Sequence, residues 1–134
     1  MTTHILAITY KPKEEAVRTG ACRQTIRPVS EAPHAKPRRI GDDALLHGWK
    51  GVPYYSKWSW RRRGPLTEVI PMLVSETHFL LDNGSLPARV VFWDEPFADD
   101  LARRDFISPP TGLALKDVLL HYYDFPLSME VLRW

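Results

Sequence analysis

Residues 75–93 carry the strongest local signal in the chain. The segment SETHFLLDNGSLPARVVFW holds two short apolar stretches on either side of Asn83 and Gly84. An Asn-Gly pair suits the positive φ angles of a tight hairpin turn. The segment therefore predicts two antiparallel strands joined by a short turn.

Short strand-like segments occupy much of the remaining sequence. Alternating patterns predict strands within 4–10, 23–27, 40–49, 58–74 and 129–134, with a bend at Gly64 and Pro65 in the fourth. Helical spacing predicts helices over 12–20, 94–105 and 111–123. Pro12 suits the first turn of the first helix, and Gly20 suits its end.

This order of elements favours one class of fold. Many short strands with a few helices segregated in the sequence predict an α+β protein: a small, mainly antiparallel β-barrel with two or three helices packed on it. A chain of 134 residues with 44% apolar and 25% charged residues is ordinary for one domain with its own core. We find no repeats and expect a single domain over residues 1–134.

The protein is expected to be cytoplasmic, without a membrane partner. No stretch approaches the roughly 18 apolar residues that a membrane helix needs, and MTTHILAITY lacks the basic start and apolar run of a secretion signal. Cys22 is the single cysteine, so an internal disulfide is impossible, which fits a reducing compartment.

Basic residues concentrate in the first half of the chain. Residues 1–63 hold 13 Lys or Arg against 5 Asp or Glu, whereas residues 64–134 hold 5 against 11. This asymmetry indicates a basic face for an anionic partner, unless folding brings the halves together and cancels it.

The segment TGACRQTIRP, residues 19–28, is the first candidate for that face. Alternate residues of a strand share one side, so a strand here would place Arg23, Thr25 and Arg27 together. Two guanidinium groups around a hydroxyl suit a phosphate or a base edge. A solvated edge strand shows the same alternation.

A second basic group begins in the proline-rich loop VSEAPHAKPRR, residues 29–39. It comprises Lys36, Arg38, Arg39, Lys50 and Lys57, interleaved with aromatic residues such as Tyr54. The pattern is typical of proteins that hold a single-stranded backbone and stack its bases, and also of a polar loop with anchoring aromatic residues.

The sequence contains no metal or common nucleotide-binding motif. Its five histidines lie far apart without ligand spacing, and one cysteine excludes a multi-cysteine zinc site. Neither G-x-G-x-x-G nor a phosphate-loop pattern occurs. We therefore expect neither a metal nor a cofactor.

Five segments, in this order, resemble the ASCH domain family: TGACRQTIR, the turn at Gly41 and Asp42, WRRRGPLTEV, ADDLARRDF and EVLRW. The resemblance covers nearly the whole chain. It implies a PUA-like β-barrel that binds RNA or a modified nucleoside or nucleotide in a cleft between the first helix and the barrel. The segment from Arg23 to Arg27 would line that cleft.

The resemblance also implies a possible hydrolase. Some members remove an acyl group from modified cytidine nucleosides with a lysine, a threonine and an acidic residue, and others are ribonucleases. The family's G-x-K-x-x-T-x-R falls on Gly20, Cys22, Thr25 and Arg27, and its acidic residue falls on Asp105. Cys22 thus replaces the lysine. It is either a nucleophile favoured by Arg23 or a small core residue.

Three functions remain open from the sequence. The first is binding of RNA or a modified nucleotide. The second is hydrolysis of a nucleoside amide or of RNA, with Cys22, Thr25 and Asp105 at the centre. The third is an accessory interaction domain without a nucleic-acid ligand.

Overall fold

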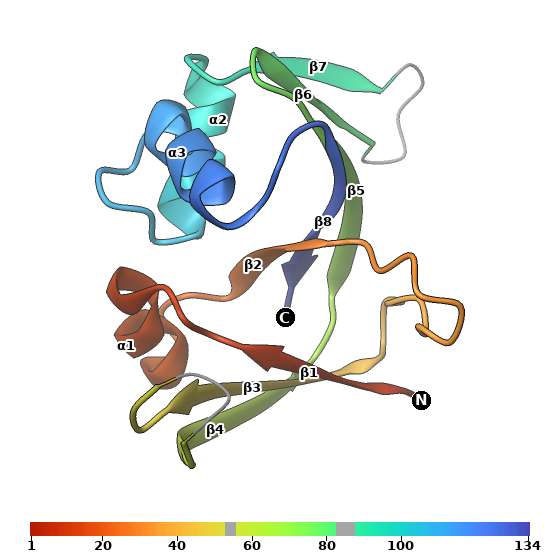
Figure 1. The fold of residues 1–134 in the computed structure, drawn as a ribbon, viewed down its shortest axis with the longest axis vertical. Coiled ribbons are helices and arrows are strands. Elements are labelled where there is room, and N and C mark those ends of the chain that lie inside the picture. Colours follow the sequence, from red (N-terminus) through yellow and green to blue (C-terminus); the bar gives the residue numbers. More distant parts are fainter. Residues whose placement is uncertain (53–55, 83–87) are drawn as a thin grey trace.

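Three helices and eight strands make up the described part of the chain, which comprises residues 1–52, 56–82 and 88–134 of a computed structural model (Figure 1). In chain order they are β1 (Thr3–Ala7), α1 (Lys11–Thr19), β2 (Gln24–Pro28), β3 (Asp43–Trp49), β4 (Trp58–Pro65), β5 (Glu68–Val74), β6 (His78–Leu81), β7 (Arg89–Phe92), α2 (Pro96–Arg104), α3 (Gly112–Tyr122) and β8 (Leu127–Arg133). The predicted α+β class and the predicted order of elements are confirmed.

The strands form two sheets. The smaller sheet has the order β1-β3-β4, with β1 parallel and β4 antiparallel to β3. The larger sheet has the order β2-β8-β5-β6-β7, and all its pairs are antiparallel. β6 pairs with β7 from His78 to Leu81, which confirms the predicted hairpin pairing. The predicted turn at Asn83 and Gly84 lies outside the described residues.

The prediction of a closed barrel is wrong, because the two sheets remain separate over the described residues. Within that part of the chain no backbone ladder joins the edge strands β1 and β2. A side chain spans the seam instead: Nη2 of Arg27 donates a hydrogen bond to the carbonyl oxygen of Ala7.

Helix α1 forms where the sequence predicted a helix. Pro12 lies in its first turn, and Gly20 ends it at a φ of 88°, a conformation that favours glycine. The buried side of the helix consists of Lys13, Ala16 and Val17. This helix therefore turns a lysine toward the protein interior.

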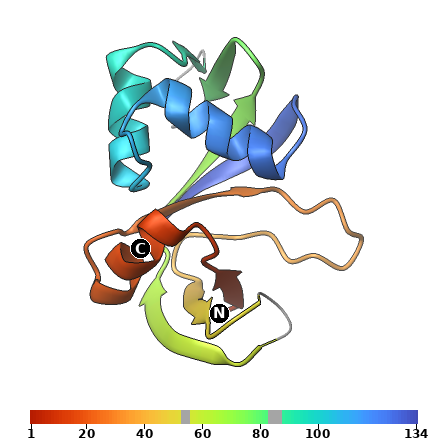
Figure 2. The same ribbon diagram turned by 60° about the vertical axis from the view of Figure 1, so that its left-hand side comes forward.

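Two apolar clusters hold the sheets and helices together. One joins the large sheet to α2 and α3 and includes Phe79 and Leu115; the other joins the small sheet to α1 and includes Leu46. Strand β8 contributes Val131 to the first cluster and Leu132 to the second. Figure 2 shows α2 and α3 together against one half of the molecule and α1 against the other.

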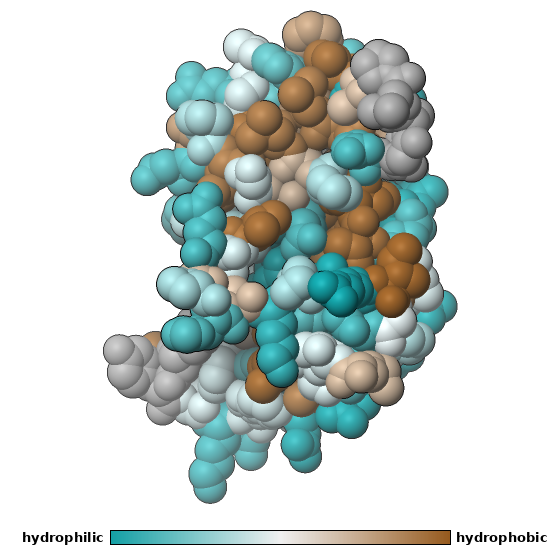
Figure 3. Space-filling view, turned by 90° about the vertical axis from the view of Figure 1, so that its right-hand side faces the viewer, coloured by the Kyte–Doolittle hydropathy of each residue, from teal (hydrophilic) through white to brown (hydrophobic). Residues whose placement is uncertain are grey.

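The outer face of the large sheet carries exposed apolar side chains. Leu73 and Val90 are exposed, and each pairs with Leu80 of the strand between them. Figure 3 shows apolar side chains gathered over the upper half of this side of the molecule and polar ones over the lower half. In the described ranges, no helix is long and apolar enough to cross a membrane.

Candidate functional site

Lys13 and Asp105 form a buried ion pair between α1 and the end of α2. Nζ of Lys13 donates to Oδ1 of Asp105 at 3.0 Å, and the two side chains are 6% and 7% exposed. Removing a charge from water costs several kcal/mol per ion, so a buried pair is weak support for stability. Such pairs are enriched at functional sites.

Burial raises the pKa of the Asp105 carboxyl. The charge and hydrogen bond of Lys13 act in the opposite direction, as do a hydrogen bond from Gln24 and the charge of Arg27. Burial therefore favours the neutral form of this carboxyl, and the neighbouring groups favour its charged form. Active sites tune an acid or a base through the same competition.

The ion pair borders a cleft between α1, β2 and α3. The cleft has a volume of about 80 Å³, and Thr25 and Arg27 of β2 line it together with the pair. Oγ1 of Thr25 accepts a hydrogen bond from Nε of Arg27 at 3.2 Å. The lining also includes three aromatic side chains, Tyr10, Tyr122 and Tyr123. Two cations, a carboxylate and a hydroxyl thus meet beside aromatic rings.

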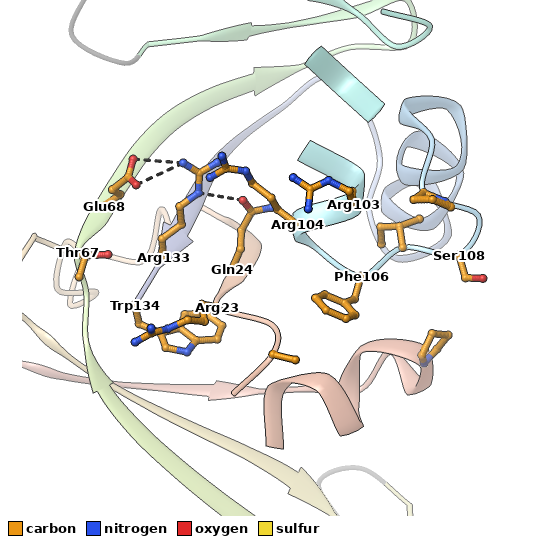
Figure 4. A pocket seen from close by; sticks show the side chains of 14 residues that line it. Arg23, Gln24, Thr67, Glu68, Arg103, Arg104, Phe106, Ser108, Arg133 and Trp134 are labelled. Atoms are coloured by element: carbon orange, nitrogen blue, oxygen red, sulfur yellow. Dashed lines mark hydrogen bonds and ion pairs between the residues drawn. The ribbon is translucent and has the colours of Figure 1, made fainter. Parts of the chain in front are cut away.

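Gln24 connects the ion pair to the opposite side of β2. Its Nε2 donates to Oδ1 of Asp105 at 3.3 Å and to the carbonyl oxygen of Leu101 at 3.1 Å. Its Oε1 accepts from Nε of Arg133 at 3.0 Å, and Arg133 is paired with Glu68 (Figure 4). A continuous series of contacts therefore runs from Lys13 through the buried amide to a second pocket.

Three of the predicted site residues come together, and Arg23 does not join them. Thr25, Arg27 and Asp105 line the cleft. Strand β2 begins at Gln24, so Arg23 lies outside the alternation that the sequence suggested, and it lines the second pocket. The arginines at the two ends of this segment therefore serve different surfaces.

Cys22 lies in the apolar cluster behind α1. It is fully buried, and its Sγ contacts the carbonyl oxygens of Gln24 and Arg104. Burial raises the pKa of the thiol. A nucleophilic cysteine needs access and a lowered pKa, so the surroundings of Cys22 match those of a core residue.

The other predicted nucleic-acid contacts lie away from the cleft. Lys36 and Arg38 line a separate surface pocket beside β1, where Nη1 of Arg38 donates to Glu130 at 3.0 Å. Arg39 and Lys57 are exposed and line neither this pocket nor the cleft. Tyr54 lies outside the described residues.

Sequence reasoning missed Lys13 and Gln24. Helical spacing was the available signal for Lys13, because it precedes Ala16 and Val17 by three and four residues and so shares their side of α1. Gln24 carried no signal of its own. Its partners lie between 77 and 109 positions away in the sequence.

Comparisons with protein families, with curated proteins and with solved structures find no match for this chain. Over the residues that the structure describes, no group of three or more His, Cys, Asp or Glu side chains gathers as a metal ion would require.

Proposed function

We propose that this protein is an ASCH-like domain that binds a modified nucleoside, free or within RNA, in the cleft between α1, β2 and α3. The observation that carries the proposal is the buried pair of Lys13 and Asp105 beside Thr25 and Arg27. Thr25 and Arg27 are also two positions at which the sequence resembles the family, and the resemblance implies a cleft beside the first helix.

The polar groups of the cleft suit the edge of a base. Lys13 and Arg27 can donate to a carbonyl oxygen, because ammonium and guanidinium groups offer several donors. In the described residues both side-chain hydrogen bonds of Asp105 use Oδ1, so Oδ2 remains to accept from an exocyclic amine. A base edge that presents a carbonyl and an amine, as cytosine does, matches this set.

The size of the cleft sets how far the ligand enters. A volume of about 80 Å³ equals the space of a few water molecules, since each occupies about 30 Å³ in the liquid. Only the base edge and its substituent fit within it. The sugar would remain outside, near Tyr10 and Tyr122, whose rings offer stacking surfaces.

Calorimetric titration with cytidine and an acylated cytidine tests the proposal. Arg27→Met is expected to weaken binding at least about tenfold, because a charge-assisted hydrogen bond to the ligand contributes about 1.5–3 kcal/mol. Arg38→Met is the matched control: Arg38 is also half-buried, but it lies at another pocket. Absence of binding by wild type, or equal losses in both variants, would reject the cleft as the site.

Hydrolysis of the bound amide is a second candidate, because Lys13 brings an amine to the cleft although Cys22 stands at the family's lysine position. The Lys13 amine would serve as the base that takes the proton of the Thr25 hydroxyl, since both residues line the cleft.

The reaction would proceed in two steps. Oγ1 of Thr25 attacks the amide carbonyl carbon, its proton passes through the Lys13 amine to the departing nitrogen, and the C–N bond breaks. Water then adds to the threonine ester, the carboxylic acid leaves, and Thr25 regains its proton. The Arg27 guanidinium at the cleft stabilises the negative charge that develops on the carbonyl oxygen.

Release of the carboxylic acid from an acylated cytidine distinguishes hydrolysis from binding alone. Thr25→Val is expected to abolish turnover, and Cys22→Ser is expected to retain it, because the thiol lies in the core. Turnover that survives in Thr25→Val would exclude this mechanism. Binding without turnover by wild type would leave the first proposal and remove the second.

A further inference from the structure

A second pocket of the described structure lies on the other side of β2. It has a volume of about 880 Å³ and is bounded by the segment before β2, the end of α2, and the facing ends of β5 and β8 (Figure 4). Its lining includes four arginines, Arg23, Arg103, Arg104 and Arg133, against a single acidic side chain, that of Glu68. We call it the arginine pocket.

The arginines keep an excess of positive charge. Arg103 and Arg104 share Asp100, at 2.6 and 3.1 Å, in exposed pairs of the kind that contribute little energy. Arg23 is exposed and forms no ion pair with any described residue. An anion that enters the pocket therefore meets guanidinium groups that it can bind without breaking a strong internal pair.

Arg133 is held in place within the pocket. Its Nε donates to Gln24, and its Nη1 lies 3.3 Å from Oε2 of Glu68, while its side chain is only 20% exposed. Two fixed contacts reduce the conformational freedom that an arginine loses when it binds an anion. Arg133 thus supplies an oriented guanidinium, and Arg23 and Arg104 supply exposed ones.

Phe106 adds an exposed ring in an unfavourable backbone conformation. It follows Asp105 at the end of α2 with a φ of 56°, the left-handed region in which glycine is favoured. The N–H of Phe106 donates to the carbonyl of Arg103 and that of Ile107 to the carbonyl of Ala102, which is the Schellman pattern of helix ends. That pattern usually places glycine where this chain has phenylalanine.

The ring of Phe106 stands at the arginine pocket and is 37% exposed. More than a third of this large apolar residue stays exposed, and its backbone conformation is unfavourable. A bulky residue kept in such a conformation indicates a function for its side chain. An aromatic ring at the edge of a positively charged pocket offers a stacking surface for a flat ligand.

We infer that the arginine pocket is a second ligand site, separate from the nucleoside cleft, and that it binds a nucleotide of single-stranded nucleic acid. Arg133, Arg104 and Arg23 bind the phosphate groups, and the ring of Phe106 stacks on the base. Guanidinium groups suit phosphate because they offer paired donors in a plane. The inference does not depend on the nucleoside cleft, because none of its four binding residues lines that cleft.

Fluorescence anisotropy with a fluorescein-labelled oligouridylate tests the inference at several salt concentrations. Arg23→Met is expected to weaken binding about tenfold at low salt. It should also reduce by about one the slope of the logarithm of affinity against the logarithm of salt concentration. Phe106→Gly is expected to weaken binding by a similar factor while leaving the salt slope unchanged, since stacking releases no counterion. Arg63→Met, which changes an exposed arginine at another surface, is the control.

The stability of Phe106→Gly separates a binding role from a structural one. Glycine relieves the left-handed conformation, so the midpoint of thermal unfolding is expected to equal or exceed that of wild type while affinity falls. Wild-type affinity in Phe106→Gly would overturn the stacking role. Equal losses in Arg23→Met and Arg63→Met, or no binding by wild type, would overturn the site.

Discussion

Replacing Lys13 by methionine removes the counter-charge of Asp105 and keeps most of the buried stem. Both side chains of the pair are less than a tenth exposed, so Asp105 is left as an unpaired buried carboxylate. Removing one partner of such a pair destabilises a protein by about 3–5 kcal/mol. With a urea m-value near 2 kcal/mol/M, the unfolding midpoint of Lys13→Met should fall by about 2 M at neutral pH.

The loss should depend on pH in a defined direction. Burial already raises the pKa of Asp105, and Lys13 is the strongest opposing influence, so the variant raises this pKa further. When the pKa of a carboxyl is higher in the folded than in the unfolded state, its protonation stabilises the fold. This stabilisation is fully present below the ordinary pKa of 3.8 and is lost as the pH rises through the raised pKa. The deficit of Lys13→Met should therefore be full at neutral pH and smaller in mildly acidic buffer.

The double variant Lys13→Met, Asp105→Leu completes the test. Apolar replacement of a whole buried pair is often neutral or stabilising, so this protein should unfold at a urea concentration near or above that of wild type and should fail to bind acylated cytidine. That result would show that the pair serves the cleft rather than the fold. A double variant as unstable as Lys13→Met, or a deficit independent of pH, would refute the reasoning.

Three further predictions concern the scaffold around both sites. Gly112→Ala should destabilise strongly and lower the thermal midpoint, because its Cβ would lie 2.0 Å from the carbonyl oxygen of Trp93, whereas Gly51→Ala, whose nearest neighbour is at 3.6 Å, should be nearly neutral. Gln24→Leu should cost about 1–3 kcal/mol in urea unfolding, since Asp105 and Arg133 each lose a buried partner; an unchanged midpoint would contradict the connection between the pockets. Thr111→Ala should cost about 1 kcal/mol by the same assay, because the threonine hydroxyl caps α3 through the N–H of Ala114 at 3.2 Å.

Local chemistry explains why the helices and the hairpin strands could be predicted. Pro12 and Gly20 mark the two ends of α1 by their own backbone preferences, which need no distant partner. The apolar stretches around residues 78–81 and 89–92 likewise form β6 and β7. Closure of a barrel, in contrast, depends on whether strands far apart in the sequence, such as β1 and β2, pair with each other. Here a hydrogen bond from the Arg27 side chain to Ala7 connects the two strands in place of a backbone ladder.

The charge distribution along the sequence pointed to the wrong half of the chain for the arginine pocket. Three of its four arginines, Arg103, Arg104 and Arg133, come from the second half, which is acidic overall. The net charge of a stretch of sequence does not show in which direction its charged side chains point in the fold. The end of α2 and the end of β8 turn their arginines toward one pocket, where Arg103 and Arg104 pair with Asp100 and Arg133 pairs with Glu68.

The sequence by itself determined the type and order of the elements and the residue types at hand for chemistry, because backbone preference and side-chain periodicity act over a few residues. Only the tertiary structure decided which of these side chains meet. Lys13 and Asp105 stand 92 positions apart, and Gln24 and Arg133 stand 109 apart. The charges and hydrogen bonds of these side chains become strong only where water is excluded. Water is excluded only once α1, α2 and β8 have packed around them.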